Sequence, residues 1–204
     1  LQYVLVGMNQ YGLYSILIPV YAFLLIPARI ALAGDHKRFL ERTAKIQAGL
    51  LICVYCLSYA PALLQLDLPG GGNARLLFFF VLMVQLSDAL QYAWAQIPSR
   101  HVIVPTISPT RTWEGLIGGT ASVTLVGAAL FWATPFPVWL AAGMSTVIAL
   151  MGFAGGLTMS AIKRDRCVKD YGTLVEGHGG VLDRIDSICF AAPVFFHFTR
   201  YFLL

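Results

Sequence analysis

The side chains best suited to chemistry are gathered in one polar stretch, Ser160–Ser187, of a chain that is otherwise mostly apolar. A glycine-rich turn within it lets backbone N–H groups converge on an anion, while the flanking lysines and arginines supply positive charge. The carboxylates of Asp183 and Asp186 are three residues apart, so on a helix they share one face and could hold a hard divalent cation. Phosphate-binding and metal-binding groups in one short segment indicate phosphoryl or nucleotidyl transfer.

A simpler interpretation is a polar loop whose lysines and arginines only fix the orientation of two membrane helices. The order of the residues favours the chemical interpretation. The stretch reads Ser-x-x-Lys-Arg, Lys-Asp, Gly-His-Gly-Gly and Asp-Arg-Ile-Asp in turn. This order resembles the signature of the phosphatidate cytidylyltransferases (CDP-diacylglycerol synthases), with the spacing of that family. One position departs from the signature, because Glu176 stands where the family has proline.

A second resemblance surrounds Asp88, which interrupts an apolar run. The segment Ser87-Asp88-x-x-Gln91-Tyr92 resembles Ser-Asp-x-x-Ala-Tyr in the same family, with a glutamine in place of the alanine. An ionised carboxylate inside a membrane helix costs about 2.5–3.5 kcal/mol on insertion scales. Asp88 is therefore expected to face a polar cavity, a cation or a basic partner. The alternative is a buried hydrogen bond that serves helix packing alone.

A third resemblance begins at Ile107, where the chain reads Ile-Ser-Pro-Thr-Arg-Thr-Trp-Glu-Gly and the family reads Ile-Ser-Pro-x-Lys-Thr-Trp-Glu-Gly. Arg111 replaces the lysine, which keeps the charge and adds bidentate phosphate geometry. Ser108-Pro109 predicts a turn and a helix start, with Glu114 in the first turn of the helix. Taken alone, this segment is also typical of a helix cap with an interfacial tryptophan.

The main departure from the family lies just before Ser160. The family usually carries Gly-Asp-Leu followed by an acidic residue there, and one of the two acidic residues is expected to bind metal. This chain has Gly155-Gly156-Leu157 followed by Thr158 and Met159. Gly152 and Gly156 also form a Gly-x-x-x-Gly pattern, which is typical of closely packed membrane helices and compatible with a homodimer.

The resemblance implies that CTP and phosphatidate are joined to give CDP-diacylglycerol and pyrophosphate. It implies Mg²⁺ as cofactor and leaves open whether a monovalent cation joins it. The metal is assigned to Asp183 and Asp186, with Asp88 as a deeper ligand. The residues expected to act in catalysis are Lys163, Arg164, Lys169, Asp170, His178 and Arg184. The residues expected to bind substrate are Ser108, Arg111, Gly177, Gly179 and Gly180.

The composition predicts an all-α polytopic membrane protein, because 58% of the residues are hydrophobic and only 12% are charged. A single membrane domain is expected over 1–204, with 1–10 as the stub of an upstream helix. About six spans are expected. They are Tyr11 to Ala33, Ile46 to Leu66, Leu76 to Ile97, Gly115 to Ala133, Val138 to Ile162 and Ile185 to Leu204. Pro19 and Pro27 predict a kink in the first span.

Basic residues orient the predicted spans. Of the fourteen lysines and arginines, all but Arg75 and Arg200 then lie on one side. The positive-inside rule places that side in the cytoplasm, and a bacterial inner membrane is the expected location. Cys53 and Cys56 lie in an apolar segment and are interpreted as small hydrophobic residues, not as a disulfide.

The expected partners are CTP, phosphatidate or a related lipid phosphate, and membrane lipid, but no nucleic acid. Three alternatives stay open. The chain could be a degenerate relative that binds lipid or a partner protein without turnover, because Gly156 replaces an acidic residue. It could transfer a nucleotide to another lipid or polyprenyl phosphate. It could be a transporter, although the charged residues cluster at one face and do not line a path across the membrane.

Overall fold

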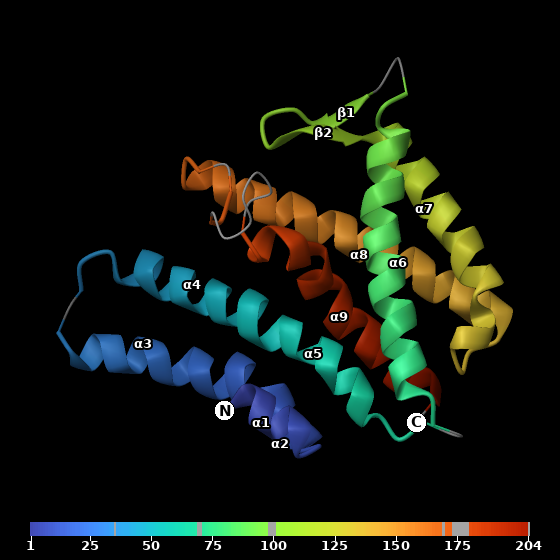
Figure 1. Ribbon diagram of the computed structural model, residues 1–204. Coiled ribbons are helices and arrows are strands. Elements are labelled where there is room, and N and C mark those ends of the chain that lie inside the picture. Colours follow the sequence, from blue (N-terminus) through green and yellow to red (C-terminus); the bar gives the residue numbers. More distant parts are fainter. Residues whose placement is uncertain (35, 69–70, 98–100, 169, 173–179, 204) are drawn as a thin grey trace.

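The computed structural model describes residues 1–34, 36–68, 71–97, 101–168, 170–172 and 180–203. These residues form a bundle of helices with one short β-hairpin at its polar end (Figure 1). The prediction of an all-α polytopic membrane protein is confirmed, because four helical segments are long and apolar enough to cross a membrane. They are Tyr11–Leu32, Phe39–Gln65, Asn73–Trp94 and Val138–Asp165.

The first two of these segments change helix type along their length. The first comprises α2 (Tyr11–Ile16), the π-helical η1 (Leu17–Ala22) and α3 (Phe23–Leu32). The second comprises α4 (Phe39–Leu50), the π-helical η2 (Leu51–Cys56), α5 (Leu57–Ala62) and the 3-10 turn η3 (Leu63–Gln65). Pro19 lies within η1. A proline has no N–H to donate and clashes with the carbonyl four residues earlier, so a local change of helical pitch is expected around it.

The remaining predicted spans are single helices. They are α6 (Asn73–Trp94), α7 (Trp113–Ala129), α8 (Val138–Asp165) and α9 (Leu182–Leu203). With 17 residues, α7 is slightly shorter than the roughly 20 residues that usually cross a bilayer. The count of six spans is therefore approximate. The predicted N-terminal stub contains the short helix α1 (Gln2–Gly7), and the link between α7 and α8 contains the 3-10 turn η4 (Phe131–Ala133).

The second polar loop contains a hairpin that the sequence analysis did not predict. Strands β1 (Val102–Val104) and β2 (Ser108–Thr112) pair antiparallel, and a hydrogen bond of 2.9 Å from Trp113 N to His101 O closes the base of the hairpin. The helix start predicted at Ser108-Pro109 is wrong, because both residues lie in β2. The helix begins at Trp113, where the Thr112 hydroxyl accepts a hydrogen bond of 3.1 Å from Gly115 N. Arg111 therefore lies on a strand and not on a helix, and the alternation of side-chain directions along β2 determines which way it points.

Glycines allow α7 to lie directly against α6. An added Cβ on Gly119 would stand 2.8 Å from both Cα and N of Gln91, and one on Gly115 would stand 2.7 Å from the Gln91 carbonyl oxygen. Gly155 of α8 has the same relation to α9, where an added Cβ would stand 2.9 Å from the carbonyl oxygen of Asp186. These close approaches bring the functional segments of α6, α8 and α9 into one place, as small residues do in membrane bundles.

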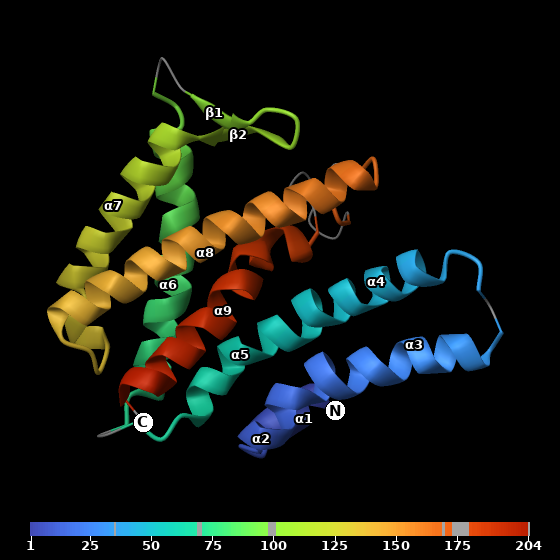
Figure 2. The same cartoon turned by 180° about the vertical axis from the view of Figure 1, so that it is seen from behind.

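The polar segments lie at the same end of the bundle. Figures 1 and 2 show the hairpin, the end of α8, the start of α9 and the α3–α4 turn on the same side, and the end of α5 and the C-terminus on the opposite side. Between these ends, buried aliphatic and aromatic side chains form the core, and Tyr59, Phe80, Phe195 and Phe196 are among its fully buried members. The arrangement agrees with the alternating direction of the predicted spans.

We expect Gly119→Ala to destabilise the protein by about 1–3 kcal/mol, because the added methyl group overlaps main-chain atoms of α6 that cannot rotate away. Thermal unfolding in detergent measures the change. Gly143→Ala in α8 is the matched control, since an added Cβ there meets nothing within 4 Å. Equal unfolding temperatures for the two variants would contradict the close contact between α6 and α7.

Candidate active site

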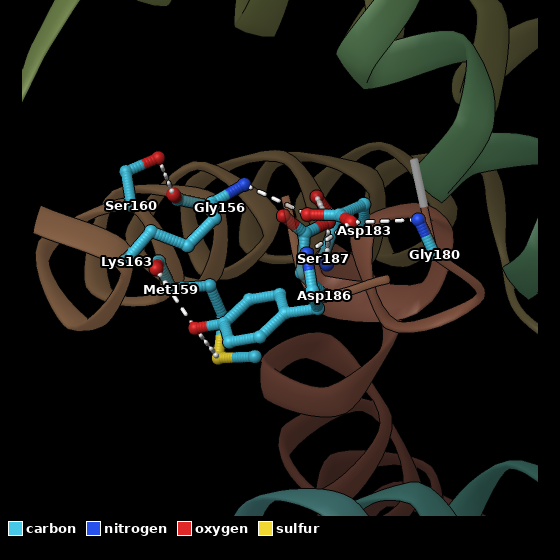
Figure 3. Close-up of polar contacts among 9 residues, drawn as sticks. Gly156, Met159, Ser160, Lys163, Gly180, Asp183, Asp186 and Ser187 are labelled. Atoms are coloured by element: carbon cyan, nitrogen blue, oxygen red, sulfur yellow. Dashed lines mark hydrogen bonds and ion pairs between the residues drawn. The ribbon is translucent and has the colours of Figure 1, made fainter. Parts of the chain in front are cut away.

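A largely shielded ion pair joins the end of α8 to the start of α9. Lys163 Nζ lies 2.9 Å from Asp183 Oδ1, and the two side chains are only 17% and 10% exposed (Figure 3). The other carboxylate oxygen of Asp183 accepts hydrogen bonds of 2.9 Å from the backbone N–H groups of Tyr171 and Gly180. Burial by itself would raise the pKa of Asp183, but these three donors outweigh it and hold the pKa below its usual value. Asp183 is therefore ionised at neutral pH.

Tyr171 fastens the same segment to α8. Its hydroxyl donates a hydrogen bond of 3.0 Å to the carbonyl oxygen of Met159, and its ring centroid lies 5.4 Å from Lys163 Nζ. The ammonium group of Lys163 thus lies between a carboxylate and an aromatic face, both of which favour a cation. The contacts of Tyr171 were not foreseen in the sequence, where a tyrosine in a polar loop carries little signal.

One turn further along α9, Asp186 belongs to a different group of residues. Its Oδ1 accepts a hydrogen bond of 2.7 Å from Ser187 N. Asp88 of α6 lines the same cavity as Asp186, and its Oδ1 atom is buried without a hydrogen-bond partner among the described residues. An unpaired carboxylate oxygen in a buried position is costly unless a cation or a donor completes it. Asp88 and Asp186 are therefore candidate cation ligands.

These side chains line one cavity of about 290 Å³ at the polar end of the bundle. Its charged residues are Asp88, Arg111, Asp183, Arg184 and Asp186. Its other lining residues are Gln85, Gln91, Tyr92, Thr110, Thr112, Gly115, Leu116 and Phe153. Carboxylates and guanidinium groups from α6, β2 and α9 thus share one small space. Such a space suits a ligand that carries phosphate groups together with a metal ion.

Two side chains from neighbouring helices hold Arg111 in place. Its Nη1 donates a hydrogen bond of 3.1 Å to Gln91 Oε1, and its Cζ lies 5.1 Å from the centroid of the Phe153 ring. Gln91 was noted in the sequence only as a departure from the family, and its role as the partner of Arg111 was missed. A signal was present, since the two departures, Gln91 and Arg111, occur in two of the three segments that resemble the family.

The structure places the other predicted residues as follows. Arg184 lines the cavity, and Gly180 binds Asp183 through its backbone. Arg164 donates a hydrogen bond of 3.2 Å to the carbonyl oxygen of Ile107, Ser108 is buried in β2, and Asp170 is exposed. The predictions for Lys169, Gly177, His178 and Gly179 fall outside the described residues.

The proposed metal ligands do not form one compact cluster. Within the described ranges, no group of three or more His, Cys, Asp or Glu side chains is arranged to hold a metal ion. The partial set fits Mg²⁺ nevertheless, because this ion commonly uses one or two carboxylates and completes its shell with water and substrate phosphates. Asp88, with its buried and unpaired oxygen, and Asp186 supply such a pair. For Asp183, which already accepts three hydrogen bonds, a place in the metal shell stays a prediction.

Comparisons with known proteins agree with the resemblance seen in the motifs. The model of the cytidylyltransferase family matches residues 1–202. The chain is 40% identical to the uncharacterized protein YnbB of Escherichia coli (strain K12), over 98% of this chain and 68% of that protein. It is 38% identical to a phosphatidate cytidylyltransferase of Staphylococcus aureus (strain COL), over 60% of this chain and 48% of the relative. It is 34% identical to a phosphatidate cytidylyltransferase of Mycobacterium leprae (strain TN), over 82% of this chain and 53% of that relative.

The chain therefore spans about half the length of these two phosphatidate cytidylyltransferases. The match to the family model nonetheless covers nearly all of the chain, including Asp88, the hairpin and the Ser160–Ser187 stretch. This chain belongs to the cytidylyltransferase family.

Proposed function

We propose that this chain carries the nucleotidyl-transfer site of a phosphatidate cytidylyltransferase, in which Mg²⁺, CTP and phosphatidate meet in the cavity at the polar end of the bundle. The observation that carries the proposal is the lining of that cavity. Asp88, Arg111 and Asp186, which come from three separate motifs, face the same space of about 290 Å³. The polar end would face the cytoplasm, where CTP is available, in keeping with the distribution of lysine and arginine.

In the proposed reaction, an oxygen of the lipid phosphate attacks the α-phosphorus of CTP. The bond from that phosphorus to the bridging oxygen breaks, and pyrophosphate leaves with the electron pair. A phosphate monoester is already largely ionised at neutral pH, so the attacking oxygen needs little help from a base. The protein must instead bring two anions together and balance the charge that builds on the leaving group.

The residues of the cavity divide this task. Arg111 and Arg184 would bind phosphate oxygens and offset their charge. Asp88 and Asp186 would hold Mg²⁺, which when bound supplies a Lewis acid that neutralises phosphate charge. Lys163 and Asp183 would act as positioning residues, because their ion pair fixes the first turn of α9, which carries Arg184 and Asp186.

An apolar groove beside the cavity suits the acyl part of a lipid substrate. The groove runs between α7 and α8 and is lined almost entirely by carbon atoms. Leu116 lines both the groove and the polar cavity, so the two spaces adjoin. A lipid whose phosphate enters the cavity could therefore leave an acyl chain in the groove, because the chain can stay in apolar surroundings while the phosphate reaches the polar residues.

A second candidate function is binding of the same ligands without turnover. Position 156 favours it, because the family residue expected to bind metal is acidic and Gly156 offers no side chain. A metal held by two carboxylates binds less tightly than one held by three, which would lower the rate at a given Mg²⁺ concentration. Turnover assays separate the two functions.

We expect Asp186→Asn to lower pyrophosphate release from CTP and phosphatidate by roughly 10²-fold or more, the usual effect of removing a charge that acts on the transition state. The assay uses the full-length protein in detergent with Mg²⁺. Asp165→Asn is the matched control, because the Asp165 side chain is 70% exposed and pairs with Arg166 outside the cavity. Pyrophosphate release by Asp186→Asn at the wild-type rate would remove Asp186 from the metal site. Wild-type protein that binds CTP but releases no pyrophosphate would favour the second candidate.

The groove gives a separate prediction. Ala121 lines it, and Ala121→Trp should fill part of its volume. We expect the KM for phosphatidate with long acyl chains to rise severalfold, whereas the KM for CTP and for dihexanoyl phosphatidate stays unchanged. Ala31→Trp on the exposed face of α3 is the control. The groove would be excluded as the acyl site if the KM values for long-chain and dihexanoyl phosphatidate rose equally, or if neither rose.

A further inference from the structure

The guanidinium group of Arg111 is held in the cavity by residues from two helices. On one edge, Nη1 bonds to Gln91 Oε1 at 3.1 Å, and the plane lies near the ring of Phe153, with Cζ 5.1 Å from its centroid. Gln91 is itself fixed, because its Nε2 donates to Ser87 Oγ at 2.8 Å and to the carbonyl oxygen of Ala149 at 3.3 Å. With only 4% of its surface exposed, Gln91 has little freedom to move. The position of the cation is thus set before any ligand arrives.

The other edge of the guanidinium group lies over Gly156. A Cβ built on Gly156 would overlap Nη2 and would stand 3.1 Å from Cζ of Arg111. Any residue with a side chain at this position would therefore displace the guanidinium group or be displaced by it. Gly152, one turn earlier on α8, differs in this respect, because a Cβ there would stand 3.4 Å from the Ser187 Cβ in ordinary contact.

This corrects the packing interpretation of the Gly-x-x-x-Gly pattern for one of its two members. Gly152 faces α9, as helix packing predicts, but Gly156 faces an arginine that comes from the hairpin. The space that an acidic side chain would fill is occupied by a group of opposite charge. The two departures from the family pattern, Arg111 and Gly156, are therefore in contact.

We propose that Arg111 and Gly156 act as a matched pair, in which the glycine provides the room that the guanidinium group needs and the guanidinium group serves as a fixed phosphate-binding cation of the cavity. A guanidinium group carries five N–H donors, and the bond to Gln91 uses one of them. Its planar shape fits two oxygens of one phosphate group. The inference rests on the proposed function, since the ligand is the triphosphate of CTP.

The test is a double-mutant cycle on CTP binding by the full-length protein in detergent with excess Mg²⁺. We expect Arg111→Ala to raise the Kd for CTP roughly tenfold or more, because a charge-assisted hydrogen bond is lost. Gly156→Ala should raise it by a similar factor although it removes no charge, since it displaces the guanidinium group. The double variant should bind no worse than either single variant, because both changes remove the same contact. Gly143→Ala, in open space on the same helix, should bind CTP like the wild type.

Thermal unfolding of the same variants separates lost binding from lost structure. Where Gly156→Ala lowers the unfolding temperature through overlap with Arg111, the double variant should recover it, because alanine at position 111 leaves the space free. A Gly156→Asp variant should also bind CTP more weakly, since its carboxylate would pair with the guanidinium group and cancel its charge.

The outcomes distinguish this inference from the proposed function. Wild-type protein that does not bind CTP at all would defeat the proposed function. Two results would overturn only the matched pair, provided that the wild-type protein binds CTP. In the first, Gly156→Ala binds CTP as well as the wild type does. In the second, the effects of the two single substitutions add in the double variant. Tighter CTP binding by Gly156→Asp would also overturn it, because position 156 would then act as a metal site in its own right.

Discussion

The ion pair between Lys163 and Asp183 is the interaction on which the functional end of this protein depends. It joins the last turn of α8 to the first turn of α9, two helices whose connection passes through the polar signature stretch. When an ion pair has little solvent exposure, the free-energy cost of removing both charges from water exceeds their mutual attraction unless their remaining hydrogen-bonding groups also find partners. The backbone donors of Tyr171 and Gly180 meet that condition at Asp183. Once this turn is fixed, Arg184 and Asp186 line the cavity.

Close approach between helices is the second constraint. The cavity contains groups from α6, β2, α8 and α9, and glycines let the backbones of α6 and α7, and of α8 and α9, lie almost in contact beside it. Gly119 and Gly155 are examples, each facing main-chain atoms of the neighbouring helix. In a membrane, where lipid competes equally for apolar surface, such packing replaces the hydrophobic effect as the force between helices. The charged site thus depends on an apolar frame with little tolerance for added volume.

Much of this could be predicted from the sequence, and the reasons for success and failure are physical. Long apolar runs determine spans, so the helices that carry Asp88 and Lys163 were predicted within a few residues of their bounds. The gathering of Asp88, Arg111, Asp183 and Asp186 followed from three ordered motifs. The hairpin was missed because β1 has three residues and β2 has five, too few for a period of two to be visible. The helix start was misplaced because Ser108-Pro109 is a strong local signal that strand pairing overrides. Arg111 and Gly156 are far apart in the sequence, one on a strand and one on a helix, so no local sequence pattern could predict their contact.

The central claim is that this cavity joins a cytidylyl group to a lipid phosphate. The most direct measurement follows two labels after incubation of the full-length protein with phosphatidate, Mg²⁺ and CTP that carries radiolabel on either the α- or the γ-phosphorus. We predict that the α label moves into the lipid extract and the γ label appears in the aqueous phase as pyrophosphate. Recovery of the γ label in lipid would indicate phosphoryl transfer instead, and recovery of both labels in unchanged CTP would contradict the account.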